Sequence, residues 1–225
     1  MQTQTPLITQ KGHLFARIES KDWVVDTGSP TSFGNSPALQ LAGQSFAVTN
    51  SYMGLTAAVL SDFIGHPAEG IIGTDILNRL DVVFDTEAGL LTLAEEILTG
   101  DDGAALPLSF FMEVPLIEVD VAGVRHSMFL DTGAQTSYFQ DDSLTDYPSM
   151  GMLEDFFPGM GNFQTSTHRV PVSLGPLTME LCCGSLPGLL GLTLAIAGVN
   201  GIVGNQALTG HKVTYLPRQK KVVFR

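Results

Sequence analysis

The sequence contains the tripeptide Asp-Thr-Gly twice, at residues 26–28 and 131–133. The surroundings repeat as well, because an apolar run precedes each copy, and a small residue, one further residue and Thr-Ser follow it. This pattern predicts a strand that ends in a tight turn and continues as a polar loop. The same local plan is therefore expected at two places in the fold.

A second pair of matching words lies downstream of these turns. Gly-Ile-Ile-Gly occupies residues 70–73 and Gly-Ile-Val-Gly residues 201–204, and strand-like segments follow each of them. The features keep the same order in both halves, although the second half is longer between its Asp-Thr-Gly and its glycine word. A recurring order of this kind predicts an internal duplication into two lobes, each with its own loops.

Length and composition agree with two lobes. The chain has 225 residues, of which 44% are hydrophobic and 15% charged, so it can bury a substantial core. Residues 99–104 are polar and rich in glycine and are predicted to be a linker. The expected organisation is an N-terminal lobe of residues 1–98 with the first Asp-Thr-Gly and a C-terminal lobe of residues 105–225 with the second.

The charge pattern limits the possible partners. A formal net charge of −12 argues against nucleic acid or an anionic membrane, because both repel an acidic surface. Such acidity serves solubility or adaptation to acidic surroundings, and both interpretations stay open. The interval between Glu180 and Lys212 lacks charged residues, as a membrane span would. Because Pro187 and several glycines interrupt it, it is predicted to be lobe core instead.

The cysteines and histidines give no sign of a metal site. Cys182 and Cys183 are neighbours, without the C-x-x-C spacing of zinc or redox sites, and the five histidines are dispersed. No metal and no cofactor is therefore expected, and free thiols fit a reducing compartment. Residues 1–19 lack the apolar core of a signal peptide, so the expected location is cytoplasmic. A periplasmic or secreted protein stays possible if the sequence is trimmed.

Most of the remaining pattern is typical of strands. Several segments alternate apolar and polar residues, which predicts an all-β protein with one or two short helices. Turns at residues 122–124 and at Gly175–Pro176 predict two hairpins, and residues 75–80 and 206–208 are the expected helices. The predicted strands cover residues 14–19, 23–25, 46–48, 82–84, 90–93, 114–121, 127–130, 170–174, 177–181 and 213–215.

The repeated turn suggests a pair of carboxylates. A turn holds the Asp at the strand end, its Gly lets the backbone approach closely and adopt positive φ, and its Thr can bond across to the other turn. If a pseudo-twofold axis relates the turns, Asp26 and Asp131 lie side by side and share one proton. One carboxyl then acts as base toward a water molecule and the other as acid toward a carbonyl oxygen. This is chemistry for amide hydrolysis without a covalent intermediate.

With both turns and both glycine words, the chain resembles the aspartic proteases over residues 14–224. Pepsin-like members are single chains of two lobes, and retropepsins are homodimers of one small lobe. This chain resembles a retropepsin lobe that has been duplicated and fused. The resemblance implies an all-β, two-lobed acid-protease fold whose retropepsin-like lobes are related by a pseudo-twofold axis, with the active site between them. A fused chain of this kind is expected to be a monomer.

The resemblance also implies roles for the other residues of the turns. Asp26 and Asp131 match the catalytic pair. Thr27 and Thr132 match threonines that brace the two loops against each other, and Gly28 and Gly133 match glycines whose backbone contacts substrate.

Further segments match supporting parts of the family fold. Residues 71–73 and 202–204 match the segments that support each catalytic loop from below. The terminal segments 6–9 and 222–225 lie where retropepsins build an inter-lobe sheet.

The flaps are where the sequence departs from the retropepsin pattern. Gly159, Met160 and Gly161 are predicted to form a flap tip in the second lobe. Tyr52 and Met53 occupy the corresponding place in the first lobe, which leaves room only for a short flap or none. The second lobe is therefore expected to supply the main lid. Both methionines can alternatively be core residues.

Two functions of different classes follow from this reading. The first is an aspartic endopeptidase that cleaves polypeptides with apolar side chains near the scissile bond, most actively at acidic to mildly acidic pH. The second is a peptide-binding or scaffold protein on the same fold that has lost useful turnover. A single Asp at a strand end is usually only a turn former, but two in matched contexts favour the catalytic interpretation. No G-x-S-x-G word supports a serine hydrolase.

Overall fold

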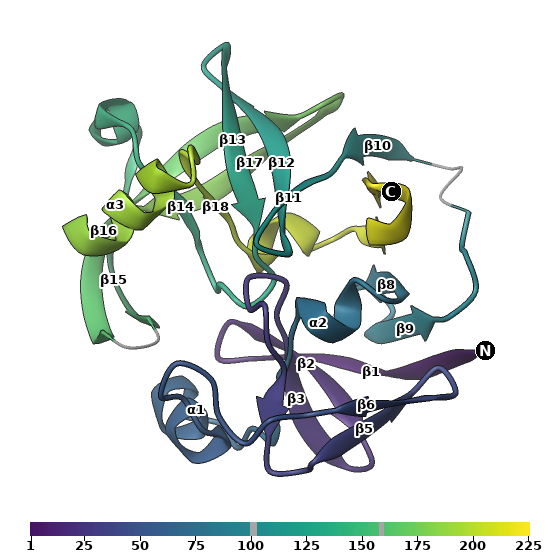
Figure 1. Ribbon diagram of the computed structural model, residues 1–225. Coiled ribbons are helices and arrows are strands. Elements are labelled where there is room, and N and C mark those ends of the chain that lie inside the picture. Colours follow the sequence, from purple (N-terminus) through teal and green to yellow (C-terminus); the bar gives the residue numbers. More distant parts are fainter. Residues whose placement is uncertain (100–102, 158–159) are drawn as a thin grey trace.

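The computed structural model describes residues 1–99, 103–157 and 160–225 (Figure 1). Strands dominate and form two large sheets and one small hairpin, which agrees with the expected all-β, two-lobed fold. The elements of the first half are β1 (Gln2–Gln10), β2 (His13–Ile18), β3 (Lys21–Val25), β4 (Phe33–Gly34), β5 (Ala38–Leu41), β6 (Gln44–Ala47), α1 (Ala57–Ile64), β7 (Gly70–Ile72), α2 (Thr74–Leu77), β8 (Asp81–Asp85) and β9 (Leu90–Ala94). Those of the second half are β10 (Ala104–Pro107), β11 (Ser109–Phe111), β12 (Val114–Val121), β13 (Val124–Leu130), β14 (Ser137–Phe139), the 3-10 helix η1 (Asp142–Asp146), β15 (Ser149–Phe157), β16 (Gly161–Leu174), β17 (Leu177–Gly184), α3 (Gly188–Ile196), β18 (Gly201–Val203), η2 (Asn205–Leu208), β19 (Lys212–Leu216), η3 (Pro217–Gln219) and β20 (Lys221–Phe224).

The first sheet has ten strands in the order β10-β20-β19-β8-β9-β1-β2-β3-β7-β4. Strands β3 and β7 run parallel, with Val25 opposite Ile72. The glycine word at residues 70–73 is therefore partly a strand, which the sequence did not predict because all three residues of β7 are buried and show no alternation. The parallel pair places the end of β3 beside the end of β7.

The second sheet has eight strands in the order β11-β12-β13-β18-β14-β17-β16-β15. Strands β13 and β18 run parallel, with Leu130 opposite Val203, so they repeat the pairing of β3 and β7. Both predicted hairpins are confirmed, with turns at residues 122–123 and 175–176. The first of these turns has positive φ at both positions, which suits a two-residue hairpin.

The C-terminal hairpin β19–β20 completes the sheet of the first half. It lies between β8 and β10, and Tyr215 of β19 pairs with Val82 of β8. The expected division into residues 1–98 and 105–225 therefore does not apply to the sheets, because strands from both segments share one sheet. Sequence patterns report which residues form strands but not which distant strand pairs with them.

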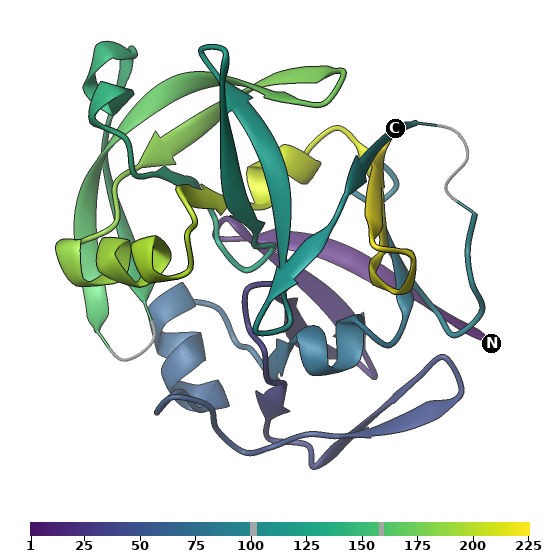
Figure 2. The ribbon, with the colours of Figure 1, turned by 45° about the horizontal axis from the view of Figure 1, so that its top comes forward.

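The expected linker and terminal segments also differ in detail. Ala104, expected in the linker, is the first paired residue of β10, and residues 100–102 lie outside the described part. The terminal segments 6–9 and 222–225 do contribute to the same sheet, but β19, β8 and β9 separate their strands. Figure 2 shows the last strands, in yellow, between segments of both halves.

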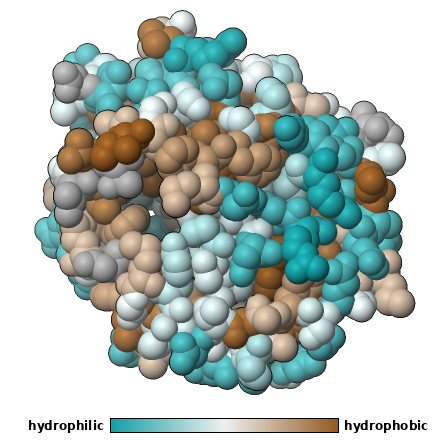
Figure 3. All heavy atoms as spheres, in the orientation of Figure 1, coloured by the Kyte–Doolittle hydropathy of each residue, from teal (hydrophilic) through white to brown (hydrophobic). Residues whose placement is uncertain are grey.

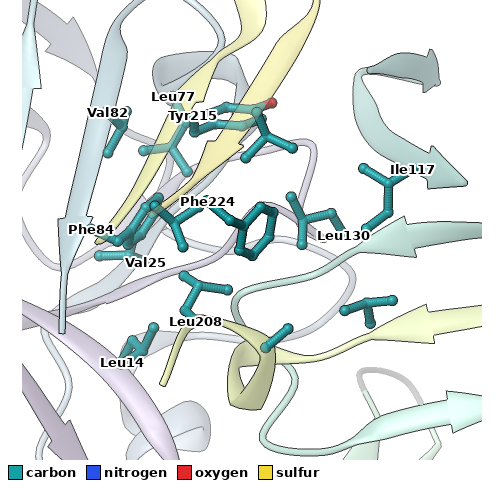
Figure 4. Packing of buried hydrophobic residues seen from close by; sticks show 14 of the residues in the cluster. Leu14, Val25, Leu77, Val82, Phe84, Ile117, Leu130, Leu208, Tyr215 and Phe224 are labelled. Carbon is teal, nitrogen blue, oxygen red and sulfur yellow. The ribbon is translucent and has the colours of Figure 1, made fainter. Parts of the chain in front are cut away.

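One large apolar cluster joins the two halves. Phe224, at 2% exposure, lies among Phe84 and Val25 of the first half and Leu130 of the second (Figure 4). Burying a side chain of this size contributes about 1.5–3 kcal/mol. The halves are therefore held by shared core as well as by shared sheet.

Helix α1 was not predicted, although its caps are visible in the sequence. The Thr56 side chain accepts a hydrogen bond from Val59 N (3.3 Å), and Gly65 ends the helix at a φ of 68°. Leu60 and Ile64 are buried against the first half. The helix occupies the stretch between β6 and β7, and this position matters for the site.

The charge-free interval of the second half contains α3, in which Leu190 and Leu194 are buried. The prediction of lobe core applies only in part, because Leu192 and Ile196 of the same helix are 57% and 77% exposed. Within the described residues, no helix has the length and apolarity needed to cross a membrane. The helix expected at residues 75–80 is present as the shorter α2, and the one expected at residues 206–208 is present as the 3-10 helix η2, which begins one residue earlier.

Candidate active site

Asp26 and Asp131 each follow directly on a strand. Asp26 comes after β3, and its backbone N–H donates to the carbonyl of Ile72 on β7 (3.0 Å). Asp131 comes after β13, and its N–H donates to the carbonyl of Val203 on β18 (2.9 Å). The glycine words therefore fix the backbone at both aspartates, as the sequence analysis expected.

The turns fix the carboxylates as well. One oxygen of Asp26, Oδ1, accepts hydrogen bonds from Gly28 N (2.8 Å) and Ser29 N (3.0 Å). Oδ1 of Asp131 does the same with the N–H groups two and three residues further along, at 2.9 and 3.1 Å. Asp side chains commonly bond in this local way. The outer oxygen of each carboxyl, Oδ2, is left for other partners.

The two threonines lock the turns to each other. The Thr27 hydroxyl donates to Leu130 O (2.5 Å) and accepts from Thr132 N (3.0 Å). In return, the Thr132 hydroxyl donates to Val25 O (2.7 Å) and accepts from Thr27 N (3.1 Å). Both threonines are buried, at 0% and 2% exposure, so these bonds have no competition from water. The bracing role implied by the resemblance fits this geometry.

The glycines of the turns lie against the opposite carboxyls. A Cβ atom on Gly28 would overlap the carboxyl group of Asp131, and one on Gly133 would overlap that of Asp26. Neither glycine has a positive φ, so that part of the expectation was wrong. Glycine is needed at both positions because of the close approach between the halves.

The electrostatics of the pair follow from this crowding. Burial, and then the neighbouring charge and hydrogen bond of Asp131, raise the pKa of Asp26 well above its usual range. Burial also raises the pKa of Asp131, while the hydrogen bond from Asp26 acts in the opposite direction. Both shifts favour a state in which the pair holds one proton in common, and the rise is the larger for Asp26.

A cavity of about 180 Å³ opens beside the two carboxyls. Its wall is largely apolar, with Phe33 and Leu60 from the first half and Tyr138 and Phe163 from the second. Figure 3 shows a hollow at the left of the molecule, bordered by brown apolar residues. An engineered cavity of about 150 Å³ takes benzene, so this one has room for an apolar side chain.

The hairpin β15–β16 forms a lid over the cavity. Phe157 pairs with Gly161 at its end. The lid residues that line the cavity lie further back along the strands, at Asp155, Phe156, Phe157 and Phe163.

The predicted tip residues that the structure describes lie away from the cavity wall. Met160 is 38% exposed, and Gly161 faces open space, so neither contributes to the wall. Gly159 lies outside the described residues. The tip residues were chosen for their glycines, whereas the aromatic residues beside them reach the cavity.

The first half has no comparable hairpin between β6 and β7, a segment that is described in full. Tyr52 and Leu55 form an isolated bridge there, and α1 follows. Tyr52 and Met53 both line the cavity, although Met53 is 60% exposed. The prediction of a short or missing first flap agrees with this arrangement.

An aromatic contact closes the gap between lid and helix. Phe63 of α1 and Phe156 of β15 stack with their ring centroids 4.9 Å apart and an interplanar angle of 9°. Figures 1 and 2 both place α1 next to the free end of the lid hairpin. Phe156 also packs against the apolar cluster of the first half. The lid is therefore held across the cavity by the other half.

Sequence reasoning missed three polar residues near the pair, namely His13, Tyr138 and Asp155, which all line the cavity. Tyr138 and Phe33 stand seven positions after their aspartates, so the repeat could have identified them as a pair. His13 and Asp155 carry no such signal. Within the described residues, no group of three His, Cys, Asp or Glu side chains could hold a metal ion.

Comparison with known proteins bears on the fold. No protein-family model matches the sequence, and no curated protein matches it either. Among solved structures, the crystal structure of Basic 7S globulin from soybean is similar, with a TM-score of 0.54 at 9% identity over 99% of this chain and 94% of that one. That protein has the pepsin-like aspartic protease fold. At this identity the likeness concerns the fold alone, because one fold can serve several functions.

Proposed function

We propose that the chain is an aspartic endopeptidase whose two lobes are related by a pseudo-twofold axis, with the active site between them. The observation that carries the proposal is the reciprocal fit of the two turns. The glycine of each turn leaves room only for the carboxyl of the other, at Gly28 against Asp131 and at Gly133 against Asp26. A turn that served only to end a strand would not need this space.

The mechanism follows from the shared proton. Asp131, as carboxylate, takes a proton from a water molecule held between the two acids, and the water oxygen attacks the carbonyl carbon of the peptide bond. Asp26 gives its proton to the carbonyl oxygen at the same time. The tetrahedral intermediate then collapses, its C–N bond breaks, and the leaving nitrogen takes the proton from Asp131. Asp26 recovers its proton from the intermediate's hydroxyl, so the pair is restored.

The proposed substrate is a polypeptide in extended form with apolar side chains near the scissile bond. Support comes from the apolar wall of the cavity, which Phe33 and Leu60 build on one side and Phe163 on the other. Both carboxyls come from one chain, so the site needs no second copy, and we propose a monomer.

The test is cleavage of an unfolded protein between about pH 3 and about pH 8, read by mass spectrometry. The wild type should cleave most strongly at acidic to mildly acidic pH, because the shared proton is lost as pH rises. Asp26→Asn and Asp131→Asn should abolish cleavage. Asp146→Asn, a change at an exposed aspartate, is the control and should cleave as the wild type does. Full-rate cleavage by Asp26→Asn would overturn the assignment.

A second candidate is a peptide-binding or scaffold protein without turnover. The lack of a flap hairpin between β6 and β7, a segment described in full, favours it, because the first half then supplies no flap hairpin of its own over a bound peptide. Under this alternative the wild type would bind peptides without cleaving them, and Asp26→Asn would bind them equally well.

A further inference from the structure

We propose that Asp155 makes the second-half side of the cavity selective for a substrate side chain with an apolar stem and a cationic end, that is, lysine or arginine. The inference rests on the proposed function, because it concerns the peptide that this site takes. It departs from the apolar specificity that the cavity wall alone suggests.

The position of Asp155 in the lid is the first support. It lies on β15 with 8% exposure and lines the cavity, whereas its neighbour Glu154 is exposed on the other face of the strand. Successive side chains of a strand point to opposite faces. The Glu154 side chain instead accepts a hydrogen bond from Asn162 Nδ2 (3.2 Å), away from the cavity.

The hydrogen bonds of Asp155 leave capacity for a ligand. The Tyr138 hydroxyl donates to Oδ2, and Phe156 N donates to Oδ1 (2.8 Å). A carboxylate can accept about four hydrogen bonds, so each oxygen retains a free lone pair. The two existing bonds hold the group in place, which lowers the entropy cost of binding a partner.

The charges around Asp155 supply no counterion. The described residues that line the cavity include the carboxyls of Asp26, Asp131 and Asp155 but no lysine or arginine. His13 is the basic group there, and its Nδ1 lies 2.9 Å from Gly133 O. Burial lowers the pKa of His13, which favours the neutral ring. A buried carboxylate without a positive partner is costly, and a ligand cation that bonds to its free lone pairs offsets part of that cost.

The surroundings of Asp155 suit the stem of such a side chain. Tyr138, Phe157, Phe163 and Leu186 lie on the same side of the cavity. Lysine and arginine bury their methylene groups against apolar surfaces while their charged ends reach a polar partner. A side chain of this type satisfies both the apolar wall and the carboxylate.

The first experiment compares two peptides that differ only in lysine or norleucine next to the scissile bond, with each flanking position tested separately. Norleucine keeps the stem and lacks the charge. The wild type should favour lysine at one of the positions by about tenfold or more in kcat/KM, as charge-assisted hydrogen bonds imply. Asp155→Asn should bring this ratio close to one. Glu154→Gln removes a charge from the adjacent residue on the outer face and should leave both activity and ratio unchanged.

A second variant separates the charge from the shape of the lid. Tyr138→Phe removes the donor to Asp155 but keeps the carboxylate, so the preference for lysine should persist. Loss of the preference in Tyr138→Phe together with its persistence in Asp155→Asn would overturn the proposal.

A binding measurement separates this inference from the proposed function. Fluorescence anisotropy with labelled peptides on Asp26→Asn should show tighter binding of the lysine peptide, and adding Asp155→Asn should remove the difference. If the wild type cleaves neither peptide but this difference is found, the endopeptidase is refuted and the specificity stands. Equal binding of both peptides, or no binding of either, refutes the specificity whatever the outcome for cleavage.

Discussion

Replacing Thr27 with valine removes a hydroxyl that serves two buried backbone groups. The hydroxyl donates to Leu130 O (2.5 Å) and accepts from Thr132 N (3.0 Å), and Thr27 is fully buried. Valine has nearly the same shape, so the carbonyl and the amide lose their partner without gaining room for water. Each buried group left unpaired costs about 1–3 kcal/mol, so the free energy of unfolding should fall by about 2–6 kcal/mol.

The reciprocal geometry predicts the same loss at the other turn. The Thr132 hydroxyl serves Val25 O (2.7 Å) and Thr27 N (3.1 Å), which are different groups, so Thr132→Val should cost as much. Thr27→Ser is the control. It keeps the hydroxyl and removes one methyl group, which should cost about 1 kcal/mol.

Urea unfolding followed by the fluorescence of Trp23 is a suitable assay. This residue is the single tryptophan, it is 1% exposed, and it lies on β3 just before the first turn. The valine variants should lower the urea midpoint strongly, and the serine variant should lower it only slightly. Equal losses for valine and serine, or a loss below about 1 kcal/mol for Thr27→Val, would refute the argument.

Three further outcomes are expected. The folded state raises the pKa of Asp26, so ionisation opposes folding, and stability is lost as pH rises from the usual aspartate range through the raised value. Asp26→Asn should therefore have a higher urea midpoint than the wild type at neutral pH and the same midpoint below about pH 4. Equal midpoints of the two proteins at every pH would contradict the raised pKa. Arg218→Met leaves the fully buried Asp81 without its positive partner at 2.9 Å, although Leu98 N and Gln219 Nε2 still donate to it, and should cost about 3–5 kcal/mol in urea unfolding. An unchanged urea midpoint would show that the ion pair does not stabilise the fold. Phe63→Ala removes the stack on Phe156 and should speed amide hydrogen exchange in the lid by up to about tenfold, and unchanged exchange would show that the stack does not hold it.

The parts of the fold that the sequence predicted are those set by short-range chemistry. The carboxylate of Asp26 accepts hydrogen bonds from N–H groups two and three residues away, so neighbouring residues in the sequence determine the turn. Strand β12 alternates buried and more exposed residues along its length, and it was predicted with its bounds.

The missed parts lack such local signals. Strands β14 and β18 are buried at every position, and β15 is exposed over most of its length. None of the three shows the alternation of buried and exposed residues that identifies a strand in a sequence. Asp155 becomes part of the candidate site only because the lid folds back to Tyr138. Pairing of β19 with β8 likewise depends on segments far apart in the chain.

That pairing has a consequence for how the protein is made. Chains are synthesised from the N-terminus, so β8 can pair with β9 early, but its other edge has no partner until residues 212–216 have been made. An open edge is a template for pairing with other chains. Chains that are still being synthesised, or that end before residue 212, therefore expose a strand edge that β19 covers in the complete protein. Chaperones and degradation machinery can distinguish the two on that basis.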